Sequence, residues 1–491
     1  MKDESTLTRY APLFSPATVA VVGASSSGGG RQNVFIRRIR ELGFAGAIYP
    51  IHPTAREIDG LSAYPSLGAT PQPIDYAFVG IAAAAVPDAL SAGAGRVRFA
   101  QVISSGFGET EKGQELQARL VAAARAGGMR LLGPNCLGIY TPRGRITFTE
   151  TRSSEVGTVG VISQSGGLGT DIVRRGALRG LRYSGVVTLG NCADLGPSDL
   201  LEFYLADAQT RVIGLYIESA NDGRRLFELL RAAHAHKPVV ILKGGRTREG
   251  TAAALSHTGA LVGDYRAWLA LSRQTGCVLV DTLDQFLDAL LVFQLLAPRT
   301  EAATSHEPRI VLLGNGGGTS VLAADYFSGL GLAVTPFDKA TRDALSALKL
   351  PPGTSVANPI DCPAGALQQE EGRIAEKLLA AVYALAQPDV LVIHLNMTPF
   401  VGRAKPRVLD NLLKAVLRVH ARHPHTHLML VLRSDGEPQL EARKRSFRKR
   451  AIGLGIPVFD ELADAGHALA ALRWHERFRE TRRLGAGPAH P

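Results

Sequence analysis

The feature that most constrains the fold is a series of short apolar runs rich in Val, Ile and Leu, each followed by a stretch with helical periodicity. These runs lie at residues 18–25, 76–82, 99–106, 158–166, 212–219, 238–245, 309–317 and 389–396. Strands that are apolar on both faces are typical of parallel sheets covered by helices on both sides. The sequence therefore predicts an α/β chain of doubly wound parallel sheets with right-handed crossovers.

The length of 491 residues is enough for about three domains. Polar, turn-rich passages near residue 150 and at 298–308 mark two boundaries. We expect domains at residues 1–150, 151–300 and 308–475, and a flexible C-terminal tail at 476–491. Residues 158–190 and 309–338 share one order of strand, Gly-rich turn, helix, turn and second strand, which indicates that the middle and last domains repeat one fold.

Composition narrows the function classes. The four cysteines include no C-x-x-C pair, which argues against a disulfide scaffold and the usual zinc spacing, so we expect a cytoplasmic protein without a metal site. The N-terminus lacks the apolar run of a signal peptide, and no stretch reaches the ~18 apolar residues of a membrane span. Net charge is +11, but the basic residues are scattered, so we expect no nucleic-acid partner. One dense run, 443–450, is either a solvated helix face or a contact for phosphate or a partner.

Three Gly-rich loops follow strands of the first segment. The first, Gly23–Gly30, leads from a strand into a helix, where backbone N–H groups can face a phosphate. Its spacing misses the G-x-G-x-x-G fingerprint, and no acidic residue ends the second strand at 47–53, which argues against a dinucleotide site. The others, at 104–109 and 131–140, end strands at the same sheet edge. This convergence favours ligand binding over a purely structural turn.

The middle segment offers a candidate nucleophile. Residues 163–167, Ser-Gln-Ser-Gly-Gly, follow a strand and open a helix whose N-terminus could hold a phosphate or could simply be well capped. His257 lies between small residues, and a neutral imidazole is nucleophilic near pH 7. A carboxylate such as Glu218 at a strand end could fix its tautomer. A structural or surface histidine is the alternative.

Several motifs resemble one known family. VVGAS, GAIYPIHP, GFGE and RLLGPNCLG in the first segment, and ALSHTGA within residues 243–265, are similar to the α subunit of NDP-forming acyl-CoA synthetases of the acetyl-CoA synthetase (ADP-forming) type, in the succinyl-CoA synthetase superfamily. The resemblance implies a Rossmann-like CoA-binding domain followed by two flavodoxin-like ligase domains. The first of the two would carry the phosphohistidine loop.

The resemblance also implies roles for individual residues. Coenzyme A would be held by Gly23, Ala24, Ser25, Ser26, Pro50, His52 and Pro53, and its thiol arm would lie near Ser104, Ser105, Gly106 and Asn135. His52 stands where the family usually has asparagine. His257 would be phosphorylated and Glu218 would orient it. The phosphate would be bound by Ser163, Gln164, Ser165, Gly166, Gly167, Ser256, Thr258 and Gly259.

The implied reaction is acid + CoA + ATP = acyl-CoA + ADP + phosphate, through an acyl phosphate and phospho-His257. Because the three segments use up the chain, we expect a separate ATP-grasp β subunit that brings ATP or ADP and Mg²⁺, in a homodimer or heterotetramer. The sequence does not identify the acyl group. The alternative is a non-catalytic regulatory protein that binds CoA or acyl-CoA.

Overall fold

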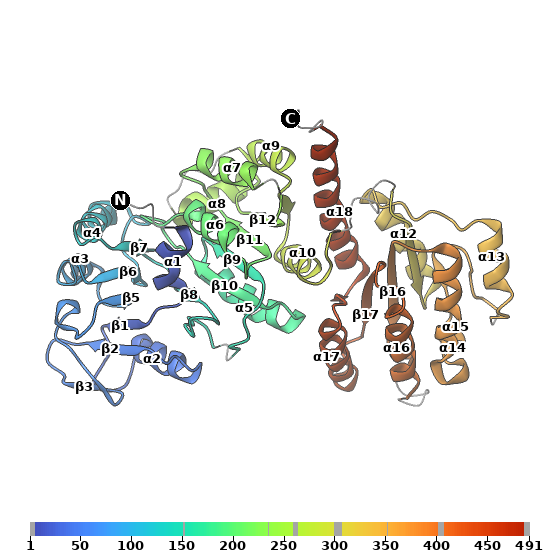
Figure 1. Ribbon diagram of the computed structural model, residues 1–491, viewed down its shortest axis with the longest axis horizontal. Coiled ribbons are helices and arrows are strands. Elements are labelled where there is room, and N and C mark those ends of the chain that lie inside the picture. Colours follow the sequence, from blue (N-terminus) through green and yellow to red (C-terminus); the bar gives the residue numbers. More distant parts are fainter. Residues whose placement is uncertain are drawn as a thin grey trace. The chain divides into compact units, whose positions relative to one another are not determined.

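The computed structural model describes residues 5–150, 153–233, 235–258, 264–298, 307–350, 352–400 and 407–485. The chain forms two compact units, Met1–Phe286 and Leu287–Pro491, called here the first and second unit (Figure 1). The predicted first two domains thus lie within one unit. The boundary also falls before the predicted linker, inside a helix.

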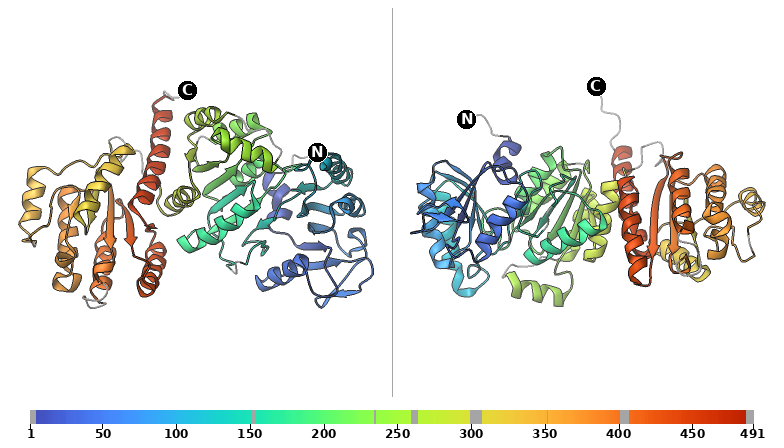
Figure 2. Two further views of the ribbon diagram at one scale, coloured as in Figure 1. Left: turned by 180° about the vertical axis from the view of Figure 1, so that it is seen from behind. Right: turned by 90° about the horizontal axis from the view of Figure 1, so that it is seen from below.

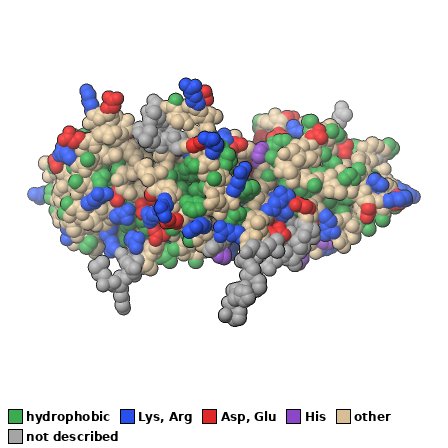
Figure 3. All heavy atoms as spheres, turned by 90° about the horizontal axis from the view of Figure 1, so that it is seen from above, with side chains coloured by type: hydrophobic (Ala, Val, Ile, Leu, Met, Phe, Trp, Pro, Cys, Tyr) green, Lys and Arg blue, Asp and Glu red, His purple; other side chains and the backbone are tan. Residues whose placement is uncertain are grey.

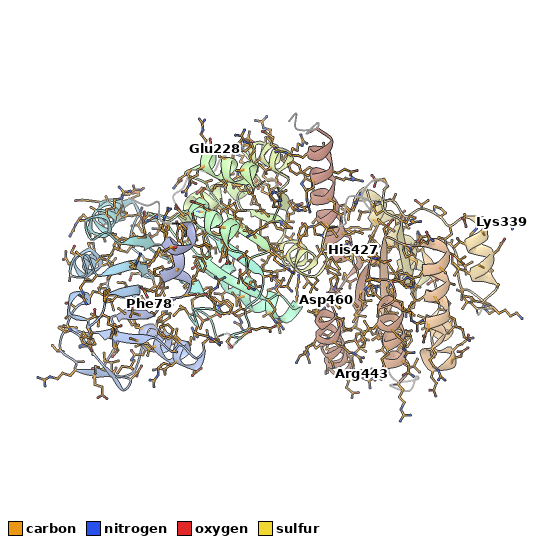
Figure 4. All side chains as sticks on the ribbon, in the orientation of Figure 1. Phe78, Glu228, Lys339, His427, Arg443 and Asp460 are labelled. Atoms are coloured by element: carbon orange, nitrogen blue, oxygen red, sulfur yellow. The ribbon has the colours of Figure 1, made fainter. Side chains whose placement is uncertain are left out.

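The first sheet of the first unit is parallel, with strand order β2-β1-β5-β6-β7. Its strands are β1 Thr18–Val22, β2 Ala47–Ile51, β5 Ile74–Val79, β6 Val97–Val102 and β7 Arg130–Leu132, with a side hairpin β3 Glu57–Ile58 and β4 Leu61–Ser62. Its helices are α1 Thr6–Phe14, α2 Arg31–Glu41, α3 Val86–Ser91 and α4 Gln114–Ala126. Figure 1 shows α3 and α4 together on one side of the strands. Phe78 of β5, labelled in Figure 4, stacks on Phe35 of α2 at 4.4 Å between ring centroids.

The second sheet of the first unit has the order β13-β12-β11-β9-β10-β8, and only β8 is antiparallel. Its strands are β8 Ile139–Tyr140, β9 Val159–Ser163, β10 Tyr183–Thr188, β11 Val212–Ile217, β12 Val239–Lys243 and β13 Val278–Val280. The helices are α5 Gly166–Arg179, α6 Pro197–Ala206, α7 Gly223–Ala232, α8 Arg248–Thr258 and α9 Tyr265–Thr275. Helix α10 Leu283–Leu295 begins in this unit and contains the boundary to the second. Phe14 of α1 stacks on Phe203 of α6 at 3.9 Å, so one apolar core joins both sheets into a single unit.

The second unit has its own core and a parallel sheet of order β15-β14-β16-β17-β18, seen from further sides in Figure 2. Its strands are β14 Ile310–Gly314, β15 Ile360–Asp361, β16 Val390–Asn396, β17 His427–Arg433 and β18 Val458–Phe459. Its helices are α12 Gly317–Gly329, α13 Lys339–Ser346, α14 Ala364–Leu367, α15 Ile374–Ala381, α16 Arg407–His420, α17 Pro438–Gly453 and α18 Leu462–Gly485.

The predicted second strand of the repeat is wrong for the second unit. Residues 332–338 form no strand, and β15 pairs with β14 at the position that β10 holds beside β9. Asn358 explains this exchange: its side chain accepts from Leu312 N–H at 3.0 Å and donates to the Thr335 carbonyl at 2.9 Å. One amide side chain thus bonds both the β14 edge and the displaced segment, while the order of the main strands is kept.

The C-terminal boundary also differs from the prediction. Helix α18 continues past residue 475 to Gly485, so the part of the expected tail before residue 486 is helical. Arg473 and Glu476 are 4% and 3% exposed and pair within the helix at 2.5 Å. Arg477, one residue farther on, pairs with Glu307 at 2.9 Å. These contacts hold the end of the helix onto the second unit.

The dense basic run lies on α17. Lys444 and Arg448 pair with Asp460, labelled in Figure 4, at 2.5 and 2.6 Å, so two of its cations have an internal role. On the face shown in Figure 3, Lys and Arg side chains are interspersed with Asp and Glu. In the described ranges, no helix has the length and apolar character to cross a membrane.

Candidate functional site

In the turn after β1, the backbone of Gly23 lies unusually close to the backbone of Gly80. Gly23 has a φ of +93°, and a Cβ there would lie 2.7 Å from the carbonyl oxygen of Gly80, so only glycine fits. Ser25 N–H donates to Asn33 Oδ1 at 2.8 Å, and the Asn33 side chain donates back to the Ser25 carbonyl at 3.0 Å. Ala24 is buried and Ser26 is exposed. The turn is a rigid cradle before α2, whose N-cap Gly30 has no side-chain cap. Residues 23–30 therefore fit the predicted phosphate-bearing ligand.

His52, which stands where the family usually has asparagine, stabilises a turn. Its Nδ1 accepts from Thr54 N–H at 3.2 Å and Ala55 N–H at 2.9 Å, which closes the turn after β2. This is the acceptor role that an asparagine side chain plays in such turns. Pro53 is exposed, whereas Pro50 is buried within β2 beside Val21, so only the turn itself offers a surface to a ligand.

The two later Gly-rich loops are joined to each other. Asn135 N–H donates to the Ser104 carbonyl at 3.0 Å, and the Ser104 hydroxyl donates to the Ile81 carbonyl. Ser105 and Gly106 are exposed. The predicted thiol-arm residues therefore lie together at the carboxyl edge of the first sheet, as the sequence indicated.

Glu109, which sequence reasoning missed, organises this edge. Its Oε1 accepts from the N–H groups of Gly106 and Phe107, and Oε2 accepts from the Asn191 amide. Burial would raise the pKa of Glu109, but these hydrogen bonds lower it, so the carboxylate stays ionised. Its only sequence signal was its place in the GFGE motif.

The two sheets of the first unit meet at this point. Asn191 N–H donates to the Pro134 carbonyl, Ala193 N–H to Gly133 and Leu195 N–H to Leu131, at 3.0, 3.0 and 3.1 Å. Asp194 Oδ2 accepts from Leu131 N–H and from Arg130, so this carboxylate has a structural role at the junction. The segment after β10 therefore runs along the loop that follows β7.

Helix α5 begins next to that junction. Ser165 is its N-cap, and its hydroxyl accepts from Leu168 N–H at 3.3 Å. The Ser163 hydroxyl donates to the Ser165 carbonyl at 2.7 Å and fixes the turn. A Cβ on Gly166 would lie 2.9 Å from the Leu137 side chain, so the helix start reaches the Gly-rich loop at 131–140. The backbone N–H groups of Gly166 and Gly167 and the positive end of the helix dipole suit a phosphate here.

The side chain of Gln164 makes hydrogen bonds within the protein, and its role in binding phosphate stays a prediction. Its Oε1 accepts from the N–H groups of Glu218 and Ser219, and its Nε2 donates to the Ser219 carbonyl at 2.8 Å and to Cys192 Sγ at 3.5 Å. It is 8% exposed. Gln164 therefore ties the end of β9 to the end of β11 and to the turn after β10.

Glu218 lies where the sequence placed it, at the carboxyl end of β11. It is 6% exposed, and its Oε1 accepts from the Tyr216 hydroxyl at 2.9 Å. Burial, followed by the charge of Glu218, raises the pKa of Tyr216, which keeps this hydroxyl a donor. Beside Glu218 opens a cavity of about 510 Å³ between α7 and α9, with Leu226, Phe227 and Trp268 among its lining residues.

His257, the predicted phosphohistidine, lies on α8. The backbone of α8 runs through Ser256, His257 and Thr258, but their side chains, and Gly259 entirely, lie outside the described residues. The structure thus brings Ser163–Gly167 and Glu218 together, and it leaves the partner of Glu218 on α8 a prediction.

The Gly-rich turn of the second unit is occupied by a carboxylate. Asp361, at the end of β15, accepts from Gly316 N–H at 2.8 Å at the start of α12. The Asn315 side chain donates to the Asn396 carbonyl and accepts from its N–H. No group of three or more His, Cys, Asp or Glu side chains that could hold a metal ion occurs among the described residues of either unit.

Comparison with known proteins gives a consistent result. Residues 17–142 match the CoA binding domain model, and residues 156–293 match the succinyl-CoA ligase like flavodoxin domain. The chain is 32% identical over 463 residues to the acetate–CoA ligase (ADP-forming) II subunit alpha of Pyrococcus furiosus, covering 94% of this chain and 96% of that protein. It is 36% identical over 352 residues to the ADP-forming acetate–CoA ligase I of Archaeoglobus fulgidus, covering 71% of this chain and 50% of that protein.

A solved structure from Ca. Korarchaeum cryptofilum, a dinucleotide forming acetyl-coenzyme A synthetase 1 in complex with phosphate and ADP, has a TM-score of 0.82 and 28% identity. The alignment covers 98% of this chain and 99% of that chain. The expected α/β architecture with CoA-binding and flavodoxin-like domains is thereby confirmed.

Proposed function

Because the chain belongs to the family of ADP-forming acid–CoA ligase α subunits, we propose that it is the CoA-binding half of such a ligase and carries a phosphoryl group on His257. Coenzyme A would lie along the turn at Gly23–Ser26 and the His52 turn. Its thiol arm would reach Ser104–Gly106 and Asn135.

The observation that carries this proposal is the junction between the two sheets. Backbone bonds from Asn191 to Pro134 and from Ala193 to Gly133 join the loop after β7 to the segment after β10. Leu137 of the same loop lies beside Gly166 at the start of α5. A thioester held by the first sheet and a phosphate held by Gly166 and Gly167 would then be neighbours. Binding two reactants side by side is the main requirement of group transfer between them.

The proposed reaction transfers the phosphoryl group in three steps. A phosphate oxygen attacks the thioester carbon, the C–S bond breaks, and CoA leaves as the thiol while an acyl phosphate forms. The neutral imidazole of His257 attacks phosphorus, and the P–O bond to the acyl group breaks to release the carboxylate. ADP then takes the phosphoryl group and becomes ATP. Gly166, Gly167 and the α5 dipole stabilise charge on the phosphate oxygens, and Glu218 holds the imidazole tautomer.

The nucleotide would come from another chain. This chain spans nearly the whole of a relative named as a subunit alpha but only half of a longer relative. We therefore propose a separate ATP-grasp β subunit that supplies ADP or ATP with Mg²⁺, in a homodimer or heterotetramer.

Acetyl phosphate labelled in its phosphoryl group tests the proposal on the full chain with Mg²⁺. We expect a label that is lost in acid and kept in base, the stability of a phosphohistidine. The H257A variant should lose this label and still bind CoA by calorimetry. H236A, which changes an exposed histidine of the same unit, is the control. CoA binding without any label in the unaltered chain would contradict the carrier role and favour the regulatory alternative.

A further inference from the structure

A buried lysine lies at the proposed transfer site. Lys243 ends β12, is 2% exposed, and its Nζ donates to the Glu218 carbonyl at 2.8 Å. The same Nζ donates to the Gly244 carbonyl. One ammonium group therefore joins the end of β11 to the turn that leads from β12 toward α8.

The charge of the Lys243 ammonium group is buried, which is energetically unfavourable. An ammonium hidden from water is costly unless it is paired or well hydrogen-bonded, and here two backbone carbonyls and an aromatic ring contact it. The Trp268 ring centroid lies 5.6 Å from Nζ, within the range of a cation–π contact. Such an arrangement favours a functional reason for the charge over a packing reason.

We infer that Lys243 is a positioning residue for phosphoryl transfer: it fixes Glu218 and the Gly244–Gly245 turn relative to each other. This inference rests on the proposed function, because Glu218 and α8 matter only if His257 carries the phosphoryl group. Lys243 Nζ donates to the backbone carbonyl of Glu218 itself, so it fixes the residue that carries this carboxylate. Helix α8 begins four residues after Gly244. A displacement of about 1 Å between reacting groups can cost on the order of 100-fold in rate.

The charge of Lys243 should be visible in the pH profile. Burial lowers its pKa to about 8, against the opposing charge of Glu218. Among the described residues, the titratable group that acts on Lys243 is Glu218, just after β11, whose carboxylate also accepts from the Tyr216 hydroxyl. Helix α9 contributes the uncharged Trp268, and Arg246 beyond the turn is paired with Asp281. Loss of the proton weakens both charge-assisted hydrogen bonds, so the transfer rate should fall as the pH rises through about 8.

The chain offers a matched control at the other end of β12. Lys237 Nζ also donates to two backbone carbonyls, those of Tyr204 and Asp207, at 2.8 and 2.7 Å. Burial likewise lowers the pKa of Lys237. It precedes β12, at the edge of the sheet opposite Glu218. K237M removes a similar pair of lysine–carbonyl hydrogen bonds without changing a residue of the proposed transfer site.

The test measures the initial rate of His257 labelling by acetyl phosphate from pH 6.5 to 9.5. We expect K243M to label about tenfold more slowly or worse and to lose the decline near pH 8. K237M should label within about twofold of the unaltered chain and keep the decline. A K243M variant that labels at the normal rate, or that keeps the decline, overturns the inference.

Hydrogen exchange of the same variants separates this inference from the proposed function. We expect K243M to raise amide exchange at 218–219 and 244–251 specifically, whereas K237M should not. If the unaltered chain takes no label, the proposed function fails, and the exchange data decide alone whether Lys243 fixes these two segments. Unchanged exchange there in K243M refutes the positioning role.

Discussion

Replacing Gln164 with leucine should destabilise the first unit by more than the small change in side-chain volume suggests. The side chain makes three hydrogen bonds to backbone groups at the end of β11: it accepts from Glu218 and Ser219 N–H and donates to the Ser219 carbonyl. Leucine has similar volume but satisfies none of them. At about 1 kcal/mol for each bond, the loss is about 3 kcal/mol, and more if the groups stay dry.

The chain itself supplies a local reporter for this change. Its two tryptophans are Trp268 in the first unit and Trp474 in the second. In a W474F background, urea unfolding followed by fluorescence therefore reports the first unit. Q164L should lower the free energy of unfolding of that unit by about 3 kcal/mol with an unchanged denaturant slope.

Gln209 provides the comparison for this experiment. It donates a single side-chain hydrogen bond, to the Gly157 carbonyl at 2.8 Å, so Q209L should cost about 1 kcal/mol. If Q164L costs no more than Q209L, the bonds to β11 do not hold the site together, and the reasoning is refuted. The labelling rate of His257 should fall in Q164L and stay normal in Q209L.

Two further changes test other parts of the molecule. G23A should weaken CoA binding about tenfold or more by calorimetry, because the φ of +93° and the Gly80 carbonyl 2.7 Å away leave no room for a methyl group. G223A, at a glycine of the same unit with nothing within 4 Å of an added Cβ, is the control, and equal affinities of the two variants would contradict the assignment. The second unit should lose stability as the pH falls from about 6.5 toward 4, because burial lowers the pKa of His394 to about 4 and the unfolded chain then binds the extra proton. Urea midpoints from Trp474 fluorescence in a W268F background measure this, and midpoints that stay constant from pH 7 to 4.5 would exclude it.

Much of the architecture was predictable because it depends on local patterns. The largely apolar runs at 18–25, 158–166 and 309–317 became β1, β9 and β14, each with a neighbouring strand on both sides. A strand buried on both faces needs such a run whatever its neighbours are. The Gly-rich turns at the strand ends followed from the same logic.

The errors occurred where a distant residue decided the outcome. Residues 332–338 had the pattern of a strand, but the Asn358 side chain and β15 took that edge of the sheet. The tail after residue 475 was expected to be flexible, but contacts with Glu307 extend the helix. Neither contact leaves a trace in the local sequence.

The sequence by itself determined the sheets, the turns and the motif residues of the site, because strand burial and turn geometry are encoded over a few neighbouring positions. Only the tertiary structure decided what those residues do. Gln164 donates to the Ser219 carbonyl, Glu109 accepts from the Asn191 amide, and Lys243 donates to the Glu218 carbonyl. Each of these pairs is far apart in the chain, so its hydrogen bond exists only once the sheets have brought the two strand ends together.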